Sequence, residues 1–273
     1  MNARRDKAKR GTETRPRVME MLKALCLPGM RAAYEECTRT AAQENLGYEE
    51  FLRMLLERET ETREARRIER LAAQSRLPHG KTFVTFDRRR LSHGTARTVG
   101  ALGDGGFLDR HENVLVFGNP GSGKTHLVCA IADEQVRKGR SVLFTTCSLL
   151  VQHLLAAKRD LALPGALKKL GRYEALVIDD IGYVQHDRDE MEVLFTLLAD
   201  RYERGSVLLT TNLPFSQWER IFKDPMVTAA AVDRLVHHSV IIELNMASYR
   251  MAAAQNARKA SGSQPEPTKE AKA

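Results

Sequence analysis

The sequence predicts an α/β fold in which a parallel β-sheet is covered by helices on both faces. Five short apolar runs recur along the chain, at 113–117, 141–145, 175–179, 206–211 and 240–244. Such near-continuous runs are typical of parallel strands that are buried on both faces. Stretches with helical spacing fall between the runs, which indicates a doubly wound α/β domain. A length of 273 residues suits one such domain plus an appendage.

The N-terminal quarter of the chain has a helical pattern. Residues 1–17 carry seven Lys and Arg against two acids, which predicts a flexible basic arm. From residue 18 onward, apolar residues recur at i, i+3, i+4 and i+7 in three stripes, interrupted at Pro28-Gly29 and again at Gly47. We therefore expect a helical N-terminal domain over 18–75.

The end of that domain is highly charged. Residues 57–70 alternate Glu and Arg, which is typical of an exposed helix held by i,i+4 ion pairs, although a DNA-binding face would read the same way. Residues 76–92 contain Pro78, Gly80 and a run of three arginines, and we expect a linker there. The α/β domain then spans 93–250, and the polar residues 251–273 predict a disordered tail.

Composition narrows the class of protein. The formal net charge of +8 favours association with polyanions, but does not separate DNA from RNA or from solubility. No apolar run approaches the roughly 18 residues that a membrane span needs, and no apolar segment follows the basic N-terminus. The four cysteines are scattered without C-x-x-C spacing, which argues against a zinc site or disulfides. We expect a cytoplasmic protein without membrane association.

A glycine-rich loop carries the strongest functional signal. Residues 118–125 read GNPGSGKT, which fits G-x-x-x-x-G-K-[ST] in full, between an apolar run and a helical pattern over 126–138. Backbone N–H groups of such a loop surround phosphate oxygens at a helix N-terminus, whereas a bare glycine turn is the alternative. Lys124 would reach the β- and γ-phosphates, and the Thr125 hydroxyl would bind Mg²⁺. The residues expected to contact ATP are Gly118, Asn119, Pro120, Gly121, Ser122, Gly123, Lys124, Thr125 and His126.

Two carboxylates follow the third apolar run. Asp179 at the end of a buried strand would hold Mg²⁺, usually through water. Asp180 occupies the position of the residue that polarises the attacking water. Glu is commoner there, and Asp is one methylene shorter, so turnover could be slow. The alternative is a pair of strand-end aspartates that cap a loop.

Further polar residues indicate a subclass, since they resemble those of AAA+ ATPases. In that class, a polar residue senses the γ-phosphate from the end of a strand that lies between the strand before the glycine-rich loop and the strand that ends in the two carboxylates. Asn212 fits this role, and its neighbour Thr211 is the second candidate. Arg234 resembles the arginine finger that one subunit presents to its neighbour's nucleotide, because a guanidinium is planar and permanently charged. An ion pair with Asp233 is the alternative. Arg250 is a candidate second sensor.

The connection after the second apolar run is longer than a simple crossover needs. Residues 148–170 leave room for an extra helix and carry Lys158, Arg159, Lys168 and Lys169. In AAA+ initiators and helicase loaders, such an insertion contacts the DNA backbone, where basic side chains neutralise phosphates. An ordinary long crossover with a solvated basic face is equally consistent with the sequence.

Taken together, the motifs resemble the IstB family of insertion-sequence helper ATPases, relatives of the helicase loader DnaC. The resemblance covers about 18–250 and rests on GNPGSGKTHL (118–127), LVIDDIGY (176–183), Arg201-Tyr202-Glu203, LTTNLPF (209–215), Trp218, DRLVHH (233–238), Ser248-Tyr249-Arg250, LCLPGM (25–30) and RRIERLAAQSR (66–76). We have no chemical role for His237-His238, for which packing is the simplest interpretation.

The resemblance implies an AAA+ ATPase with a five-stranded parallel sheet that uses ATP and Mg²⁺. It implies a homo-oligomer with a trans arginine finger, which assembles on DNA without sequence preference and recruits or stimulates a transposase. Only residues 245–273 follow the last strand, which predicts a lid reduced to about one helix. A helicase loader that uses ATP as a switch is the alternative. A P-loop small-molecule kinase is a third, which no phosphoacceptor pocket supports.

Overall fold

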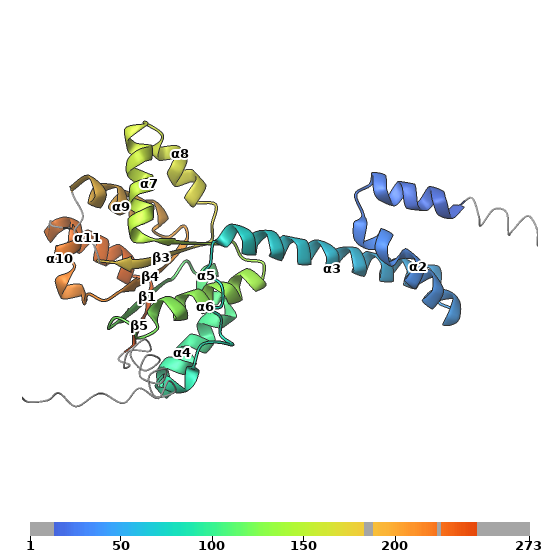
Figure 1. Ribbon diagram of the computed structural model, residues 1–273, viewed down its shortest axis with the longest axis horizontal. Coiled ribbons are helices and arrows are strands. Elements are labelled where there is room, and N and C mark those ends of the chain that lie inside the picture. Colours follow the sequence, from blue (N-terminus) through green and yellow to red (C-terminus); the bar gives the residue numbers. More distant parts are fainter. Residues whose placement is uncertain (1–13, 183–187, 223–224, 245–273) are drawn as a thin grey trace, which may run out of the picture. The chain divides into compact units, whose positions relative to one another are not determined.

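A computed structural model shows two compact units, and the boundary between them in the chain falls between Arg70 and Leu71. The structure describes residues 14–182, 188–222 and 225–244 (Figure 1). Within them, no helix has the length and apolar character needed to cross a membrane. The candidate sensor Arg250, the reduced lid and the tail over 251–273 lie outside the described residues.

The first unit is helical. It contains a helix over 14–24, α2 (Pro28–Gln43) and the first part of α3 (Tyr48–Ser75). The predicted arm is therefore too long, because residues 14–17 already belong to the first helix. The apolar stripes meet in a small core of Leu22, Met30, Ala33, Cys37 and Leu55.

The Pro28-Gly29 interruption is a close contact between α2 and α3. The buried Glu59 carboxylate on α3 accepts hydrogen bonds from the backbone N–H groups of Gly29 (2.7 Å) and Met30 (3.1 Å) at the start of α2. A Cβ at Gly29 would lie 2.6 Å from the Arg58 carbonyl oxygen, so a larger residue does not fit. Glu59 thus satisfies the free N–H groups of the α2 N-terminus.

Ion pairs join neighbouring turns of α3, as predicted. Arg53 pairs with Glu50 and Glu57, and Arg63 donates to Glu59 at 2.7 Å across one helical turn. Pairs at this spacing each stabilise a helix by about 0.2–0.5 kcal/mol. The paired side chains named here therefore have partners on their own helix.

The second unit is built on a five-stranded parallel sheet of order β2-β3-β4-β1-β5. All five predicted strands are present, with ends shifted by at most two residues. The strands are β1 (Asn113–Gly118), β2 (Val142–Thr146), β3 (Ala175–Ile181), β4 (Ser206–Thr211) and β5 (Ser239–Leu244). β4 lies between β1 and β3, so the chain segments that follow these three strands meet at one edge of the sheet.

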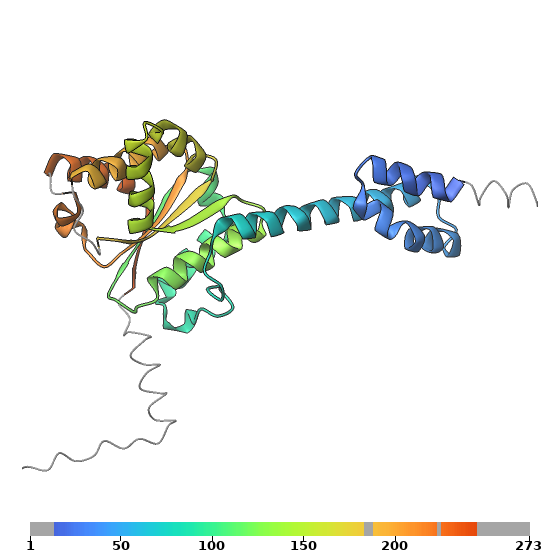
Figure 2. The ribbon, with the colours of Figure 1, turned by 45° about the horizontal axis from the view of Figure 1, so that its top comes forward.

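Helices cover both faces of this sheet, as Figure 1 and Figure 2 show. One layer holds α4 (His93–Asp104), α5 (Gly106–Asp109) and α6 (Lys124–Arg137), and shares a core with one face of the strands. The other layer holds α7 (Cys147–Arg159), α8 (Leu163–Leu170), α9 (Arg188–Arg201), α10 (Glu219–Phe222) and α11 (Pro225–Val236). The long connection after β2 therefore contains an extra helix, α8, as its length allowed.

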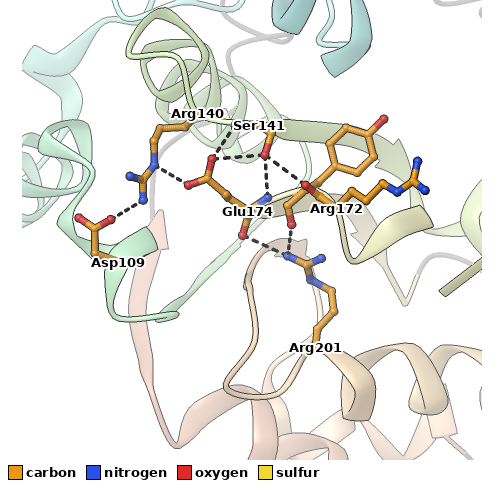
Figure 3. Close-up of polar contacts among 7 residues, drawn as sticks. Asp109, Arg140, Ser141, Arg172, Glu174 and Arg201 are labelled. Carbon is orange, nitrogen blue, oxygen red and sulfur yellow. Dashed lines mark hydrogen bonds and ion pairs between the residues drawn. The ribbon is translucent and has the colours of Figure 1, made fainter. Parts of the chain in front are cut away.

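A buried arginine fixes the amino-terminal edge of the sheet. The Arg201 guanidinium donates to the carbonyl oxygens of Tyr173 and Glu174, both at 3.1 Å, and to that of Ser206 at 3.0 Å. The Glu174 carboxylate also forms an ion pair with Arg140 and accepts a hydrogen bond from the Ser141 backbone N–H (Figure 3). Burial, partly opposed by nearby Asp200, lowers the pKa of Arg201 to about 10, so the group stays charged at neutral pH. It joins the end of α9 to the starts of β3 and β4.

The expected linker over 76–92 is in part a packed segment of the second unit. Phe86 is buried in the core beside α6, and Leu77 and Phe83 pack at its border. Arg88, in the short 3₁₀ helix Arg88–Arg90, lies over the Phe83 ring at 4.2 Å. The Pro and Gly residues of this segment are typical of a linker, but they do not indicate that its aromatic side chains are buried.

Candidate nucleotide-binding site

A cleft of about 280 Å³ lies at the carboxyl-terminal edge of the sheet. Three parts of the chain line it: the glycine-rich loop with the start of α6, the residues that follow β3 and β4, and the segment before α4. Its lining side chains include Lys81, Phe86, Lys124, Thr125, Asp180 and Asn212. The structure thus brings together the residues of the loop and the strand ends that the sequence placed far apart.

The loop backbone requires glycine at its first position. Gly118 has a φ of 154°, and a Cβ there would lie 2.5 Å from the Leu244 carbonyl oxygen and 2.9 Å from Ser122 Oγ. Gly123 precedes α6 with a φ of 97°, in the left-handed region that glycine adopts without strain. The loop therefore passes close to the end of β5 and turns directly into the helix.

Lys124 lies within this loop. Its ammonium group donates to the carbonyl oxygens of Gly118 (2.8 Å) and Asn119 (3.1 Å), and the side chain is almost fully buried. Ser122 is also buried, and its hydroxyl has no hydrogen-bond partner within the described residues. A lysine and an unsatisfied hydroxyl in a glycine-lined loop suit an anionic ligand.

A buried threonine connects the two aspartates to β4. The Thr210 hydroxyl donates to Asp179 Oδ1 at 2.6 Å and accepts the Asp180 backbone N–H at 2.8 Å. Asp180 has a φ of 61°, and the register between β3 and β4 shifts between Ile178 and Ile181. Asp179 is buried and Asp180 is exposed toward the cleft. Thr210 was missed in the sequence, where it reads as one more residue of a buried strand.

The two candidate sensors after β4 have different surroundings. The Thr211 hydroxyl donates to the Ile181 carbonyl oxygen at 2.9 Å and accepts the Leu213 N–H at 3.1 Å, so it holds the strand end. Asn212 lines the cleft. Of the two, Asn212 has the position from which a side chain could contact a bound ligand.

The segment before α4 supplies a wall that the sequence did not predict. His126 Nε2 lies 3.0 Å from Thr85 Oγ1, and its ring meets Phe86 edge-on at 5.3 Å. Burial, opposed by a hydrogen bond with Thr82 and aided by Lys81, lowers the pKa of His126. His126 therefore fixes this wall beside the loop. Aromatic residues in a supposed linker were the signal that could have revealed it.

Arg234 is not in this cleft. It lies near the end of α11, where its guanidinium donates to the Ala230 carbonyl oxygen at 3.1 Å and covers the Phe195 ring at 4.9 Å. The carbonyl oxygen of the next residue, Leu235, accepts a hydrogen bond from the side chain of Asn113 at the start of β1. The glycine-rich loop begins at the other end of β1, at Gly118. Each residue of a parallel strand adds about 3.3 Å, so the two ends of β1 are about 16 Å apart. Arg234 is therefore separated from its own loop by the length of β1.

The residues of the cleft fit a nucleoside triphosphate with its metal ion. Loop N–H groups and Lys124 could hold the phosphates, because they are donors gathered at a helix N-terminus. Thr125 lines the cleft, and Asp179 is buried at the end of β3 next to Asp180, which does line it. Thr125 and Asp179 could hold Mg²⁺, since both offer the oxygen ligands that this ion prefers. Phe86 offers an apolar wall on the loop side.

The fold and this cleft define a P-loop protein, in which a parallel α/β sheet carries the glycine-rich loop at its carboxyl-terminal edge. Similar folds occur in AMPPCP-bound DnaA from Aquifex aeolicus (TM-score 0.53, 14% identity, 68% of this chain and 56% of that chain). DnaI is similar too (TM-score 0.51, 19% identity, 63% of this chain and 94% of that chain). These likenesses confirm the predicted fold.

The chain belongs to the family described as IstB-like ATP binding protein, which matches residues 20–257. An insertion-sequence ATP-binding protein of Sinorhizobium fredii is 41% identical over 89% of this chain and 82% of its own length. The IS21 ATP-binding protein of Pseudomonas aeruginosa is 37% identical over 80% of this chain and 82% of its own. The family resemblance stated from the motifs is thereby confirmed.

Proposed function

We propose that the protein is an ATP-dependent, DNA-binding helper of insertion-sequence transposition. The observation that carries this proposal is that the glycine-rich loop, Asp180 and Asn212 line the same cleft. Relatives of the chain are named for ATP binding in insertion sequences, which supports the proposal further. We further propose that the protein hydrolyses ATP and that DNA and self-assembly stimulate this reaction.

The proposed hydrolysis divides the work among the residues of the cleft. Lys124 stabilises negative charge on the β- and γ-phosphates, and Mg²⁺ held by Thr125 and Asp179 would supply further charge neutralisation. Asp180 orients and polarises the attacking water, and Asn212 detects the γ-phosphate. The left-handed backbone at Asp180 is held by Thr210, so this carboxylate is directed by the strand beside it.

Assembly would complete the site. Arg234 lies at the opposite edge of the sheet from its own loop, which supports a role at the nucleotide of a neighbouring subunit rather than at its own. A head-to-tail contact that repeats between identical chains places each Arg234 at the next cleft. We therefore propose a homo-oligomer with a trans arginine finger.

The proposed DNA contact lies on the α7–α8 insertion. Arg159, Lys168 and Lys169 are exposed there. Lys158, which the sequence grouped with them, instead pairs with Glu192 at 2.9 Å and Asp189 at 3.5 Å on α9. Contacts to phosphates neutralise charge without reading bases, so this binding should tolerate any sequence.

A binding experiment tests the DNA contact. In the ATP-bound state, Lys168→Ala and Lys169→Ala should each reduce the slope of log affinity against log salt by about one unit. Lys158→Ala is the matched control and should leave the slope unchanged. A wild-type affinity that does not change with salt would contradict phosphate contact.

A partner experiment tests the biological role. The protein with ATP and DNA should retain the transposase of its own insertion sequence on an affinity resin, and Lys124→Ala should lose it. Retention of the replicative helicase instead of the transposase would favour the loader function. Transfer of phosphate to a metabolite, without hydrolysis that responds to DNA, would favour a kinase.

A further inference from the structure

A cluster of possible metal ligands lies at the amino-terminal edge of the sheet, away from the nucleotide cleft. Glu203, His237 and His238 place one ligand atom each within 4.8 Å of one another. All three side chains are exposed, and the His237 ring lies against those of His238 and Tyr202, so the packing predicted for the two histidines takes place at the surface. Glu203 follows α9 and the histidines follow α11.

The backbone under this cluster is held on both sides. The buried Arg201 side chain fixes the turn that carries Glu203 through the Ser206 carbonyl oxygen, and the Arg204 N–H donates to the Arg201 carbonyl oxygen at 3.0 Å (Figure 3 shows Arg201). On the other side, the Asn113 N–H donates to the His238 carbonyl oxygen at 2.7 Å. The three ligands therefore project from fixed positions.

A tyrosine orients one of the imidazoles. Tyr202 Oη lies 3.0 Å from His237 Nδ1. When Nδ1–H donates to the tyrosine oxygen, Nε2 has its lone pair free for a metal ion. Histidines that bind metals usually make such a second hydrogen bond, which fixes the ring and its tautomer.

The electrostatic setting also favours a cation. α9 and α11 both end at this cluster, and a helix C-terminus carries a partial negative charge of about half a unit. Three arginines lie near the cluster, and each has other partners. Arg201 donates to backbone carbonyl oxygens, and Arg204 pairs with Asp200 at 3.4 Å. Arg234 is directed to the Ala230 carbonyl oxygen and the Phe195 ring. Its hydrogen bond and ring contact thus lie within α11 and against α9.

We propose that Glu203, His237 and His238 form a binding site for a divalent transition-metal ion, with Zn²⁺ as the ion that best matches two imidazoles and one carboxylate. Zn²⁺ takes nitrogen and oxygen ligands at about 2.0–2.2 Å, which sets neighbouring ligands roughly 3.3 Å apart. Side-chain rotation of the exposed residues closes the remaining gap. Three protein ligands leave a fourth position for water. The bound ion joins the end of α9 to the end of α11, beside Arg234.

The test is direct metal binding by the full chain. Untagged protein, stripped with a chelator and free of nucleotide, is titrated with Zn²⁺ against a chromophoric competitor. One equivalent should bind, and His237→Ala, His238→Ala and Glu203→Gln should each weaken it tenfold or more. Tyr202→Phe should weaken it by about tenfold, as loss of an orienting partner does. Absence of stoichiometric Zn²⁺ binding by folded wild-type protein would overturn the proposal.

Two controls separate this site from others. His153→Ala removes an exposed histidine on α7 and should leave the affinity unchanged. Asp179→Asn should also retain Zn²⁺, because the nucleotide cleft is a different site. Zn²⁺ should raise the Tm of the wild type and of both controls, but not of His238→Gln, a milder variant that keeps the turn. Equal Zn²⁺ affinity in the three ligand variants and the wild type would refute the assignment.

Discussion

The Thr210 hydroxyl connects Asp179, the candidate metal ligand, to the backbone of Asp180, the candidate water-polarising residue. Thr210→Val removes this connection with little change in the shape of the side chain. The variant loses a hydrogen bond of 2.6 Å to the Asp179 carboxylate and one of 2.8 Å from the Asp180 N–H. A hydrogen bond to a charged group contributes about 1.5–3 kcal/mol and a neutral one about 0.5–1.5 kcal/mol. The second unit should therefore be about 2–4.5 kcal/mol less stable.

The functional effect should exceed what a loss of stability explains. With Thr210→Val, Asp179 is free to rotate and the left-handed Asp180 loses its support, so more Mg²⁺ should be needed for half-maximal turnover and kcat should fall. Chemical denaturation and initial rates against Mg²⁺ concentration measure the two effects. Thr210→Ser keeps the hydroxyl and should restore the Mg²⁺ dependence. If valine and serine behave alike, or valine matches the wild type, the role assigned to Thr210 is wrong.

Two further predictions concern Gly118 and Glu59. Gly118→Ala places a Cβ 2.5 Å from the Leu244 carbonyl oxygen, so ATP affinity measured by calorimetry should fall at least tenfold. Gly165→Ala on α8, where nothing lies within 4 Å of the added Cβ, is the control and should have no effect. Equal ATP affinities of the two variants would contradict the loop geometry. Burial raises the pKa of Glu59, but Arg63 and the N–H groups of Met30 and Gly29 outweigh it and lower the pKa. The stability that Glu59 contributes is therefore complete at neutral pH and is lost as the pH falls below about 4.3 toward the lowered folded value. Hydrogen exchange of α2 should show this loss in the wild type and not in Glu59→Gln, and identical pH profiles would refute it.

The strands could be predicted because their signal is local. Five apolar runs bounded by polar or glycine residues mark strands buried on both faces, and the sheet of the structure has those strands. The loop at 118–125 was equally accessible, since its glycines and Lys124 are adjacent in sequence. Each of these features depends on neighbours a few residues away.

The missed residues depend on contacts between distant segments. Phe86 meets His126 across 40 positions, and Thr210 meets Asp179 across 31. Nothing in a window around either residue reports such a contact. Arg201 shows the same limit, because an arginine at a helix end usually lies in solvent, and only the fold shows that it is buried against four carbonyl oxygens.

The central claim is that each nucleotide site is completed by Arg234 of a neighbouring subunit. Lys124→Ala lacks a working loop but retains Arg234, and Arg234→Ala has the reverse defect. Each variant alone should hydrolyse ATP far more slowly than the wild type. In an equal mixture, about a quarter of head-to-tail contacts join an intact loop to an intact arginine, so about a quarter of the wild-type rate should return on DNA. A mixture no more active than its separate components, or full activity of Arg234→Ala alone, would contradict the claim.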